Sequence, residues 1–184
     1  MNPALVLTIF RIILIPPFVL LFARGASTGR GNGLLLPLFV LIALSDVLDG
    51  PLARSRQQVS TLGTILDVGS DLTFILAVLW TGAFKEMLPW WIPAAISVQI
   101  LQFIGDSLLF FSPAPRRPLR ENRLGKVAGV LYYLLVGLLS LHLSFPGLLS
   151  PALLSSLFPL VFAYTLLCLV MRARLYWQSR QDSS

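Results

Sequence analysis

The sequence predicts an all-α membrane protein in which six transmembrane helices form one bundle. Of its 184 residues, 56% are hydrophobic and only 12% are charged, whereas soluble domains are about 45–50% apolar and about 25% charged. Several apolar runs reach the roughly 20 residues that a helix needs to cross about 30 Å of hydrocarbon. Because lipid offers the backbone no hydrogen-bond partners, these runs are expected to be helical.

The predicted spans follow one another along the chain, so residues 1–184 are expected to form a single domain. The spans cover about 4–23, 34–54, 62–84, 88–111, 124–143 and 150–171. The connections between them are short and polar or rich in Pro and Gly, and none is long enough for a separate soluble domain. The first run lacks a basic flank and contains Arg11 and the Pro16-Pro17 pair, so we interpret it as a retained helix rather than a cleaved signal peptide.

Lys and Arg are distributed unequally between the two sides of such a bundle. One side holds Arg54, Arg56, Arg116, Arg117, Arg120, Arg123, Lys126, Arg172, Arg174 and Arg180, and the other holds only Arg24, Arg30 and Lys85. The positive-inside rule therefore predicts that both termini are cytoplasmic, and the absence of a transit peptide fits a bacterial inner membrane. Because the basic residues cluster beside the spans, we attribute the net charge of +6 to contact with anionic lipid rather than nucleic acid.

Acidic residues are concentrated near the cytoplasmic ends of the second and third predicted spans. The chain has eight acidic residues, and four of them are Asp46, Asp49, Asp67 and Asp71. An Asp at the centre of a bilayer costs about 2.5–3.5 kcal/mol on insertion scales, so acids within membrane spans usually face a cavity and mark a functional site. Four carboxylates together would repel one another unless cations were present.

Helical spacing predicts that these aspartates line two facing stripes. In the second span, one helical face is formed by Asp46, Asp49, Gly50, Ala53 and Arg54. In the third span, Gly63, Asp67 and Asp71 recur every four residues. A short connection between antiparallel helices allows the two stripes to face each other across the bundle interior.

The ligand chemistry of the stripes predicts a hard cation. Carboxylate oxygens without nearby His or Cys favour Mg²⁺ first and Mn²⁺ second. Gly50, Ala53 and Gly63 leave room for a bulky anion, and Arg54 can bind a phosphate through two donors. The alternatives are close helix packing for the small residues and a positive-inside anchor for Arg54.

The complete pattern resembles the signature of the CDP-alcohol phosphotransferase family, also called the CDP-alcohol phosphatidyltransferase family. It reads Asp46-x2-Asp49-Gly50-x2-Ala53-Arg54-x8-Gly63-x3-Asp67-x3-Asp71 and matches the family at each fixed position. The resemblance extends to the six predicted spans and to the Asn2-Pro3 and Thr8-x2-Arg11 pattern that precedes Pro16.

The resemblance implies an enzyme that transfers a phosphatidyl group from CDP-diacylglycerol to an alcohol, releases CMP and works as a homodimer. By the same resemblance, Asp46, Asp49, Asp67 and Asp71 bind two ions of Mg²⁺ or Mn²⁺, and Asp71 is also the catalytic base. The CDP-lipid would contact Thr8, Arg11, Gly50, Ala53, Arg54, Ser60 and Gly63. For Arg11, the alternative is a basic side chain that extends to the membrane surface.

The acceptor alcohol is predicted less directly. The basic segment before the fifth span, with Arg116, Arg117, Arg123 and Lys126, can receive a phosphorylated acceptor, or it can serve topology and lipid attraction alone. The N-terminal segment and Gly125-Lys126 resemble the phosphatidylglycerophosphate branch of the family, which favours glycerol 3-phosphate.

Other features leave further acceptors open. In the phosphatidylglycerophosphate and cardiolipin synthase branches, a Pro and a Lys are usual where this chain has Val68 and Leu72. These departures keep inositol phosphate, phosphatidylglycerol, serine and choline as alternatives. Asp106 in the fourth span either lines the acceptor pocket or pairs with a basic residue.

Two different classes of function compete with a transferase. A cation transporter would explain the aspartates, but it has no use for Arg54 beside them. A catalytically inactive lipid-binding family member would not need all four aspartates.

Overall fold

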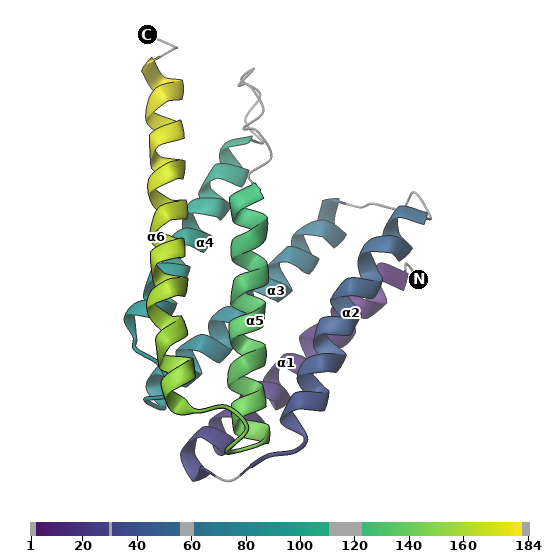
Figure 1. Ribbon diagram of the computed structural model, residues 1–184. Coiled ribbons are helices and arrows are strands. Elements are labelled where there is room, and N and C mark those ends of the chain that lie inside the picture. Colours follow the sequence, from purple (N-terminus) through teal and green to yellow (C-terminus); the bar gives the residue numbers. More distant parts are fainter. Residues whose placement is uncertain (1–2, 30, 56–60, 111–122, 182–184) are drawn as a thin grey trace.

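The computed structural model describes residues 3–29, 31–55, 61–110 and 123–181, and this part of the chain is all-helical, without a β-strand. Its six helices are α1 (Pro3–Thr28), α2 (Leu35–Ser55), α3 (Thr61–Phe84), α4 (Trp91–Phe110), α5 (Arg123–Ser144) and α6 (Pro151–Gln181) (Figure 1). Each predicted span corresponds to one helix, so the all-α prediction is confirmed.

Four of these helices are long and apolar enough to cross a membrane. Their apolar segments are Thr8–Thr28 in α1, Leu66–Phe84 in α3, Gly125–Ser144 in α5 and Pro151–Arg174 in α6. Within the described residues, the apolar parts of α2 and α4 are shorter, at Leu35–Ser45 and Trp91–Gly105. Six helices are therefore established for this part of the chain, whereas six membrane crossings remain a prediction.

Two helices extend beyond the apolar runs that predicted them. The predicted span ends at residue 23, but α1 is helical as far as Thr28. Gly29, with a φ of 61°, caps the helix, and its amide donates to the Gly25 carbonyl at 3.0 Å. Helix α6 continues to Gln181, because residues 172–181 contain no Pro or Gly to stop it. Only the apolar part of a membrane helix must lie in lipid, and its polar continuation can extend into water.

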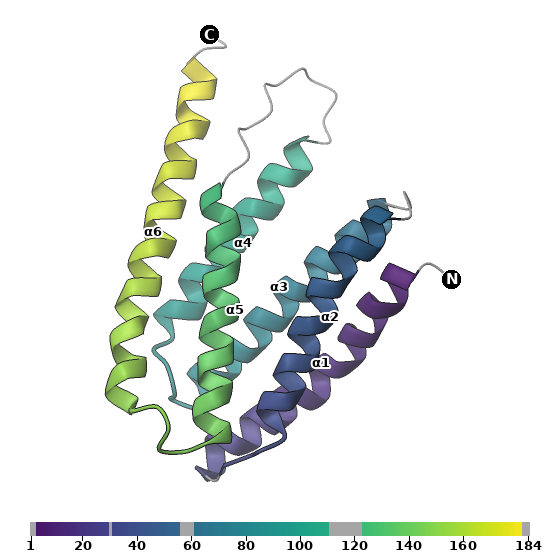
Figure 2. The same ribbon diagram turned by 45° about the vertical axis from the view of Figure 1, so that its right-hand side comes forward.

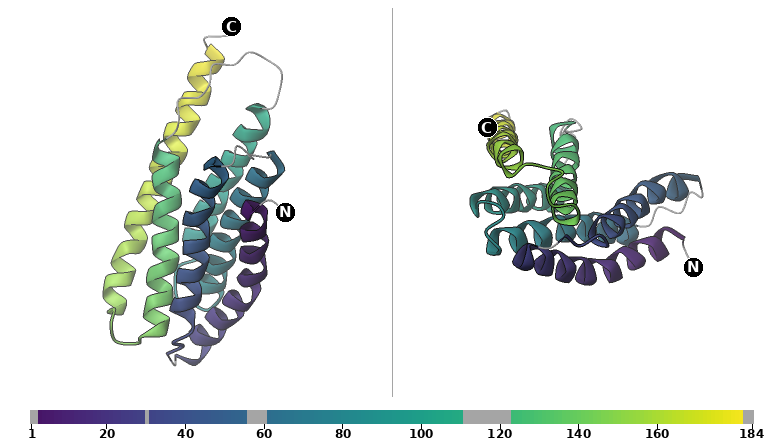
Figure 3. Two further views of the ribbon diagram at one scale, coloured as in Figure 1. Left: turned by 90° about the vertical axis from the view of Figure 1, so that its right-hand side faces the viewer. Right: turned by 60° about the horizontal axis from the view of Figure 1, so that its bottom comes forward.

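The connections α1–α2, α3–α4 and α5–α6 lie at one end of the bundle (Figures 1 and 2). The N-terminal end of α1 and the C-terminal end of α6 point to the opposite end. Helix α1 packs along both α2 and α3, while α4 and α6 pack together and α5 contacts helices of both groups. Figure 3 shows α1 curving along the outside of its neighbours.

An aromatic cluster fixes α1, α2, α3 and α5 relative to one another. It consists of Phe18, Phe22, Phe39, Phe74 and Tyr133. The rings of Phe18 and Phe74 meet edge to face with their centroids 5.1 Å apart, a favourable aromatic geometry. Two helical turns separate Phe18 from Arg11 and Phe74 from Asp67, so this packing sets how the polar residues of α1 and α3 meet.

Helices α4, α5 and α6 share a buried polar contact. The Tyr132 hydroxyl donates to the side-chain oxygen of Gln99 at 2.5 Å and lies 2.9 Å from the Thr165 hydroxyl. All three side chains are buried. Hydrogen bonds of this kind hold helices together where lipid provides little hydrophobic driving force.

Candidate active site

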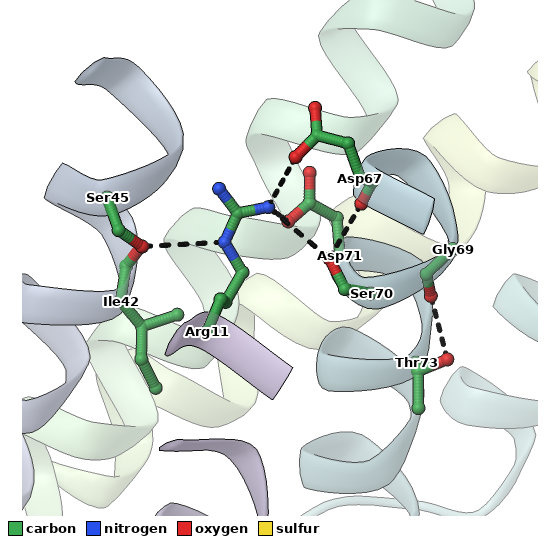
Figure 4. Close-up of polar contacts among 8 residues, drawn as sticks. All are labelled: Arg11, Ile42, Ser45, Asp67, Gly69, Ser70, Asp71 and Thr73. Atoms are coloured by element: carbon green, nitrogen blue, oxygen red, sulfur yellow. Dashed lines mark hydrogen bonds and ion pairs between the residues drawn. The ribbon is translucent and has the colours of Figure 1, made fainter. Parts of the chain in front are cut away.

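The guanidinium of Arg11 lies at the centre of the polar contacts between α1, α2 and α3. Its Nη1 donates to Oδ1 of Asp67 at 2.8 Å and to Oδ1 of Asp71 at 2.7 Å (Figure 4). The Arg11 side chain is 0% exposed, whereas those of Asp67 and Asp71 are 35% and 22% exposed. The cation is therefore on the buried side of the pair, and the carboxylates are on the accessible side.

Two serine hydroxyls also lie near the guanidinium. Ser70 Oγ lies 3.4 Å from Arg11 Nη1, and Ser45 Oγ lies 3.5 Å from Arg11 Nε. Each hydroxyl donates its own proton to a carbonyl of its helix, Ser70 to Asp67 at 2.8 Å and Ser45 to Ile42 at 2.7 Å. Their lone pairs are thus available to the Arg11 donors, which links α1 to both α2 and α3.

The charges explain why this arrangement forms. A fully buried arginine is stable only when its charge is paired, and removing one partner of such a pair is strongly destabilising. Asp67 and Asp71 are one helical turn apart on α3, so their carboxylates lie on the same face and repel each other without a cation. One guanidinium between them relieves both problems.

The predicted residues of α2 occupy the helical segment expected for them. Asp46, Asp49, Gly50, Ala53 and Arg54 all lie in the C-terminal half of α2. Their side chains are outside the described part of the structure, so their positions relative to Asp67 and Asp71 remain a prediction. Gly63 likewise lies in the first turn of α3, and Ser60 falls outside the described residues.

The other predicted contacts are distributed around this centre. Thr8 is buried on α1, nearly one turn before Arg11. Lys126 is exposed in the first turn of α5, whose first residue is Arg123. Arg116 and Arg117 lie outside the described residues, as does the side chain of Arg123.

His142, the single histidine of the chain, lies far along α5 from this centre. Its Nδ1 is 3.1 Å from the Leu149 carbonyl at the α5–α6 connection, which is at the opposite end of the bundle from the N-terminal end of α1 (Figure 1). His142 is therefore too distant to serve Asp67 and Asp71.

The donor atoms of the site fit a hard cation. Asp67 and Asp71 supply carboxylate oxygens, which suit Mg²⁺ or Mn²⁺. Among the described side chains, no group of three or more His, Cys, Asp or Glu residues gathers at one place. The other two predicted ligands, Asp46 and Asp49, are not among those side chains, so the full set of four remains a prediction.

A family model described as CDP-alcohol phosphatidyltransferase matches residues 1–171. The chain belongs to the CDP-alcohol phosphatidyltransferase family. This confirms the family predicted from the aspartate pattern, and with the four long apolar helices it identifies a membrane protein.

Curated members of the CDP-alcohol phosphatidyltransferase family are similar to this chain over much of its length. A cardiolipin synthase (CMP-forming) of Streptomyces coelicolor is 32% identical over 67% of this chain and 57% of its own length. A probable phosphatidylglycerophosphate synthase of Mycobacterium tuberculosis is 27% identical over 79% of this chain and 68% of its own. The CDP-diacylglycerol–glycerol-3-phosphate 3-phosphatidyltransferase of Escherichia coli is 37% identical over 59% of this chain and 58% of its own. The chain thus spans little more than half the length of the first and third relatives.

The sequence interpretation missed the partners of Arg11 and the roles of Ser45 and Ser70. A signal for Arg11 was present, because it is the one charged residue within the first predicted span and such a residue requires a partner. Each serine directly precedes a predicted metal ligand, Ser45 before Asp46 and Ser70 before Asp71. Serine is too common within helices for that position alone to have indicated a contact.

Proposed function

We propose that this protein is an integral membrane enzyme of phospholipid biosynthesis that transfers a phosphatidyl group from CDP-diacylglycerol to an alcohol and releases CMP. The observation that carries the proposal is the partly exposed Asp67–Asp71 pair, backed by a buried guanidinium, in a member of the CDP-alcohol phosphatidyltransferase family. The acceptor that we favour is glycerol 3-phosphate, since two of the similar proteins are named for phosphatidylglycerophosphate formation or for a glycerol-3-phosphate acceptor.

The metal site of this enzyme consists of Asp46, Asp49, Asp67 and Asp71, which hold two ions of Mg²⁺ or Mn²⁺. When bound, such ions neutralise the charge of a pyrophosphate and of the departing nucleotide. Support comes from the oxygen-only donors of Asp67 and Asp71 and from the location of Asp46 and Asp49 on α2, which packs against α1 as α3 does.

In the reaction, the acceptor hydroxyl oxygen attacks the phosphorus that carries the diacylglycerol. The bond from that phosphorus to the oxygen of CMP breaks, and CMP leaves with the electron pair. Asp71 accepts the hydroxyl proton, for which its 22% exposure leaves access. Arg54 on α2 binds the pyrophosphate through its planar donors, and Gly50, Ala53 and Gly63 leave space for the nucleotide.

The membrane setting follows from the same helices. The protein crosses a bacterial inner membrane six times, with both termini and the active site on the cytoplasmic side, and it works as a homodimer. The two ends of the described chain point to the same end of the bundle, as an even number of crossings requires (Figure 1). The basic residues Arg116, Arg117, Arg123 and Lys126 attract a phosphorylated acceptor to that side.

The test is CMP release by the protein purified in detergent with CDP-diacylglycerol and Mg²⁺. The acceptor panel is glycerol 3-phosphate, inositol phosphate, inositol, serine, choline and phosphatidylglycerol. We expect release with glycerol 3-phosphate, and its loss when EDTA removes the metal. Release with another acceptor would correct the acceptor but not the reaction, and no CDP-lipid binding would contradict the proposal.

A further inference from the structure

Nη1 of Arg11 donates to one oxygen of each of two neighbouring carboxylates on α3. The contacts are to Oδ1 of Asp67 and Oδ1 of Asp71. In Figure 4 the other oxygen of each carboxylate lies on the side away from the Arg11 side chain. Each carboxylate thus has one oxygen bonded to the buried guanidinium, while its side chain as a whole stays partly exposed.

We propose that Arg11 is a positioning residue for the metal-binding carboxylates. Its guanidinium fixes Oδ1 of Asp67 and of Asp71, and each side chain thereby presents its second oxygen to the metal. This inference rests on the proposed function, because it requires that Asp67 and Asp71 bind metal. It differs from the role implied by the family resemblance, in which Arg11 contacts the CDP-lipid.

The guanidinium is itself rigidly held, as a positioning group must be. It is fully buried, and its Nε and Nη1 are near the hydroxyls of Ser45 and Ser70. These hydroxyls come from two different helices and are oriented by their own bonds to backbone carbonyls. The plane of the guanidinium is therefore defined by α2 and α3 together.

Fixing the carboxylates favours metal binding because two like charges one turn apart otherwise turn away from each other. Ligating carboxylates are commonly oriented by hydrogen bonds from a second layer of residues, and loss of such a partner weakens metal affinity by about 10–100-fold. A guanidinium that instead competed with the metal for the carboxylates would have the opposite effect, because its removal would strengthen metal binding. The sign of the change in affinity decides between these roles.

The experiment measures Mn²⁺ binding to the full-length protein in detergent, without CDP-lipid, from the electron paramagnetic resonance signal of free Mn²⁺. The variants are Arg11→Met, which removes the donors, and Arg11→Lys, which keeps the charge but not the planar guanidinium with its several donors. The matched control is Arg24→Met, an exposed arginine on the same helix. We expect Kd to rise about 10–100-fold for Arg11→Met, less for Arg11→Lys, and not at all for Arg24→Met.

A second pair of variants keeps the test valid if Arg11→Met does not fold. Ser45→Ala and Ser70→Ala leave the ion pairs in place and remove one contact each to the guanidinium, so we expect a rise in Kd of a few-fold. A further readout is CMP release by Arg11→Lys, which should recover at high Mn²⁺ concentration. A purely structural role would lower thermal stability without this recovery.

An unchanged or lower Mn²⁺ Kd in the folded Arg11 variants would overturn the inference. Weaker CDP-lipid binding with an unchanged Mn²⁺ Kd would also overturn it and would show that Arg11 contacts the CDP-lipid.

The outcomes for the proposed function are separate from those for the inference. If wild-type protein releases CMP but the variants bind Mn²⁺ normally, only the inference fails. If the variants lose Mn²⁺ affinity but the wild-type protein releases no CMP from CDP-diacylglycerol with each acceptor of the panel, only the transferase proposal fails.

Discussion

Arg11 and Asp71 are 60 positions apart in the sequence, yet Nη1 of the arginine lies 2.7 Å from Oδ1 of the aspartate. This contact joins α1 to the last aspartate of the family signature, which lies on α3. It places a permanent cation directly behind the carboxylate proposed as the catalytic base. The predictions below test that carboxylate, its neighbour and the packing that holds both.

Asp71→Asn is expected to lower CMP release by about 10²–10⁴-fold, the usual contribution of a general base. Asn retains an oxygen that can accept from Arg11, so the fold and CDP-lipid binding should be preserved. CMP release and CDP-lipid binding are measured on the same preparation. Glu86→Gln, at an exposed acid beyond the end of α3, is the matched control and should leave the rate unchanged. A rate in Asp71→Asn within threefold of wild type would exclude Asp71 as the base.

Asp67→Asn is expected to raise the Mg²⁺ concentration needed for half-maximal CMP release by at least about tenfold. The reason is that an amide oxygen is a weaker ligand for a hard cation than a carboxylate. Because the defect lies in metal binding, excess Mg²⁺ should restore part of the rate, whereas it should not rescue Asp71→Asn. Titration of Mg²⁺ into EDTA-treated protein measures both. An unaltered Mg²⁺ requirement would remove Asp67 from the ligand set.

Phe74→Ala is expected to destabilise the bundle by about 3–5 kcal/mol, because Phe74 is fully buried and packs against Phe18, Phe39 and Tyr133. The change is measured by thermal unfolding in detergent. Phe84→Ala on the same helix is the control, since Phe84 is 78% exposed. Equal losses of stability in the two variants would show that the aromatic cluster does not hold the helices together.

Gly137→Ala is expected to destabilise the bundle by about 1–3 kcal/mol through overpacking. A Cβ at this position would lie 2.9 Å from a ring carbon of Phe39, and Phe39 is itself packed against Phe18 and Phe74. Gly129→Ala on the same helix would meet nothing within 4 Å and should keep or slightly increase stability. Unfolding temperatures of the two variants in one detergent give the comparison. A stability for Gly137→Ala equal to that of Gly129→Ala would contradict the predicted clash.

The helices and the family were predictable because both depend on local patterns. An apolar run of about 20 residues specifies a helix wherever it lies in lipid, and the aspartate signature is recognised from spacing alone. The C-terminal ends of α1 and α6 were harder to predict, because a helix ends where its hydrogen bonds end rather than where its apolar run ends. The positions of the Asp46, Asp49 and Arg54 side chains, the number of membrane crossings and the acceptor remain predictions.

The sequence by itself determined that Asp67 and Asp71 share one face of a helix, since a spacing of four residues corresponds to about one turn. It also showed that Arg11 is alone among charged residues in the first apolar run, but it left open whether this side chain contacts the CDP-lipid or extends to the membrane surface. Only the tertiary structure decided that Arg11 pairs with Asp67 and Asp71. That choice depends on how Phe18 and Phe74 pack α1 against α3, and no local rule relates residues 56 and 60 positions apart.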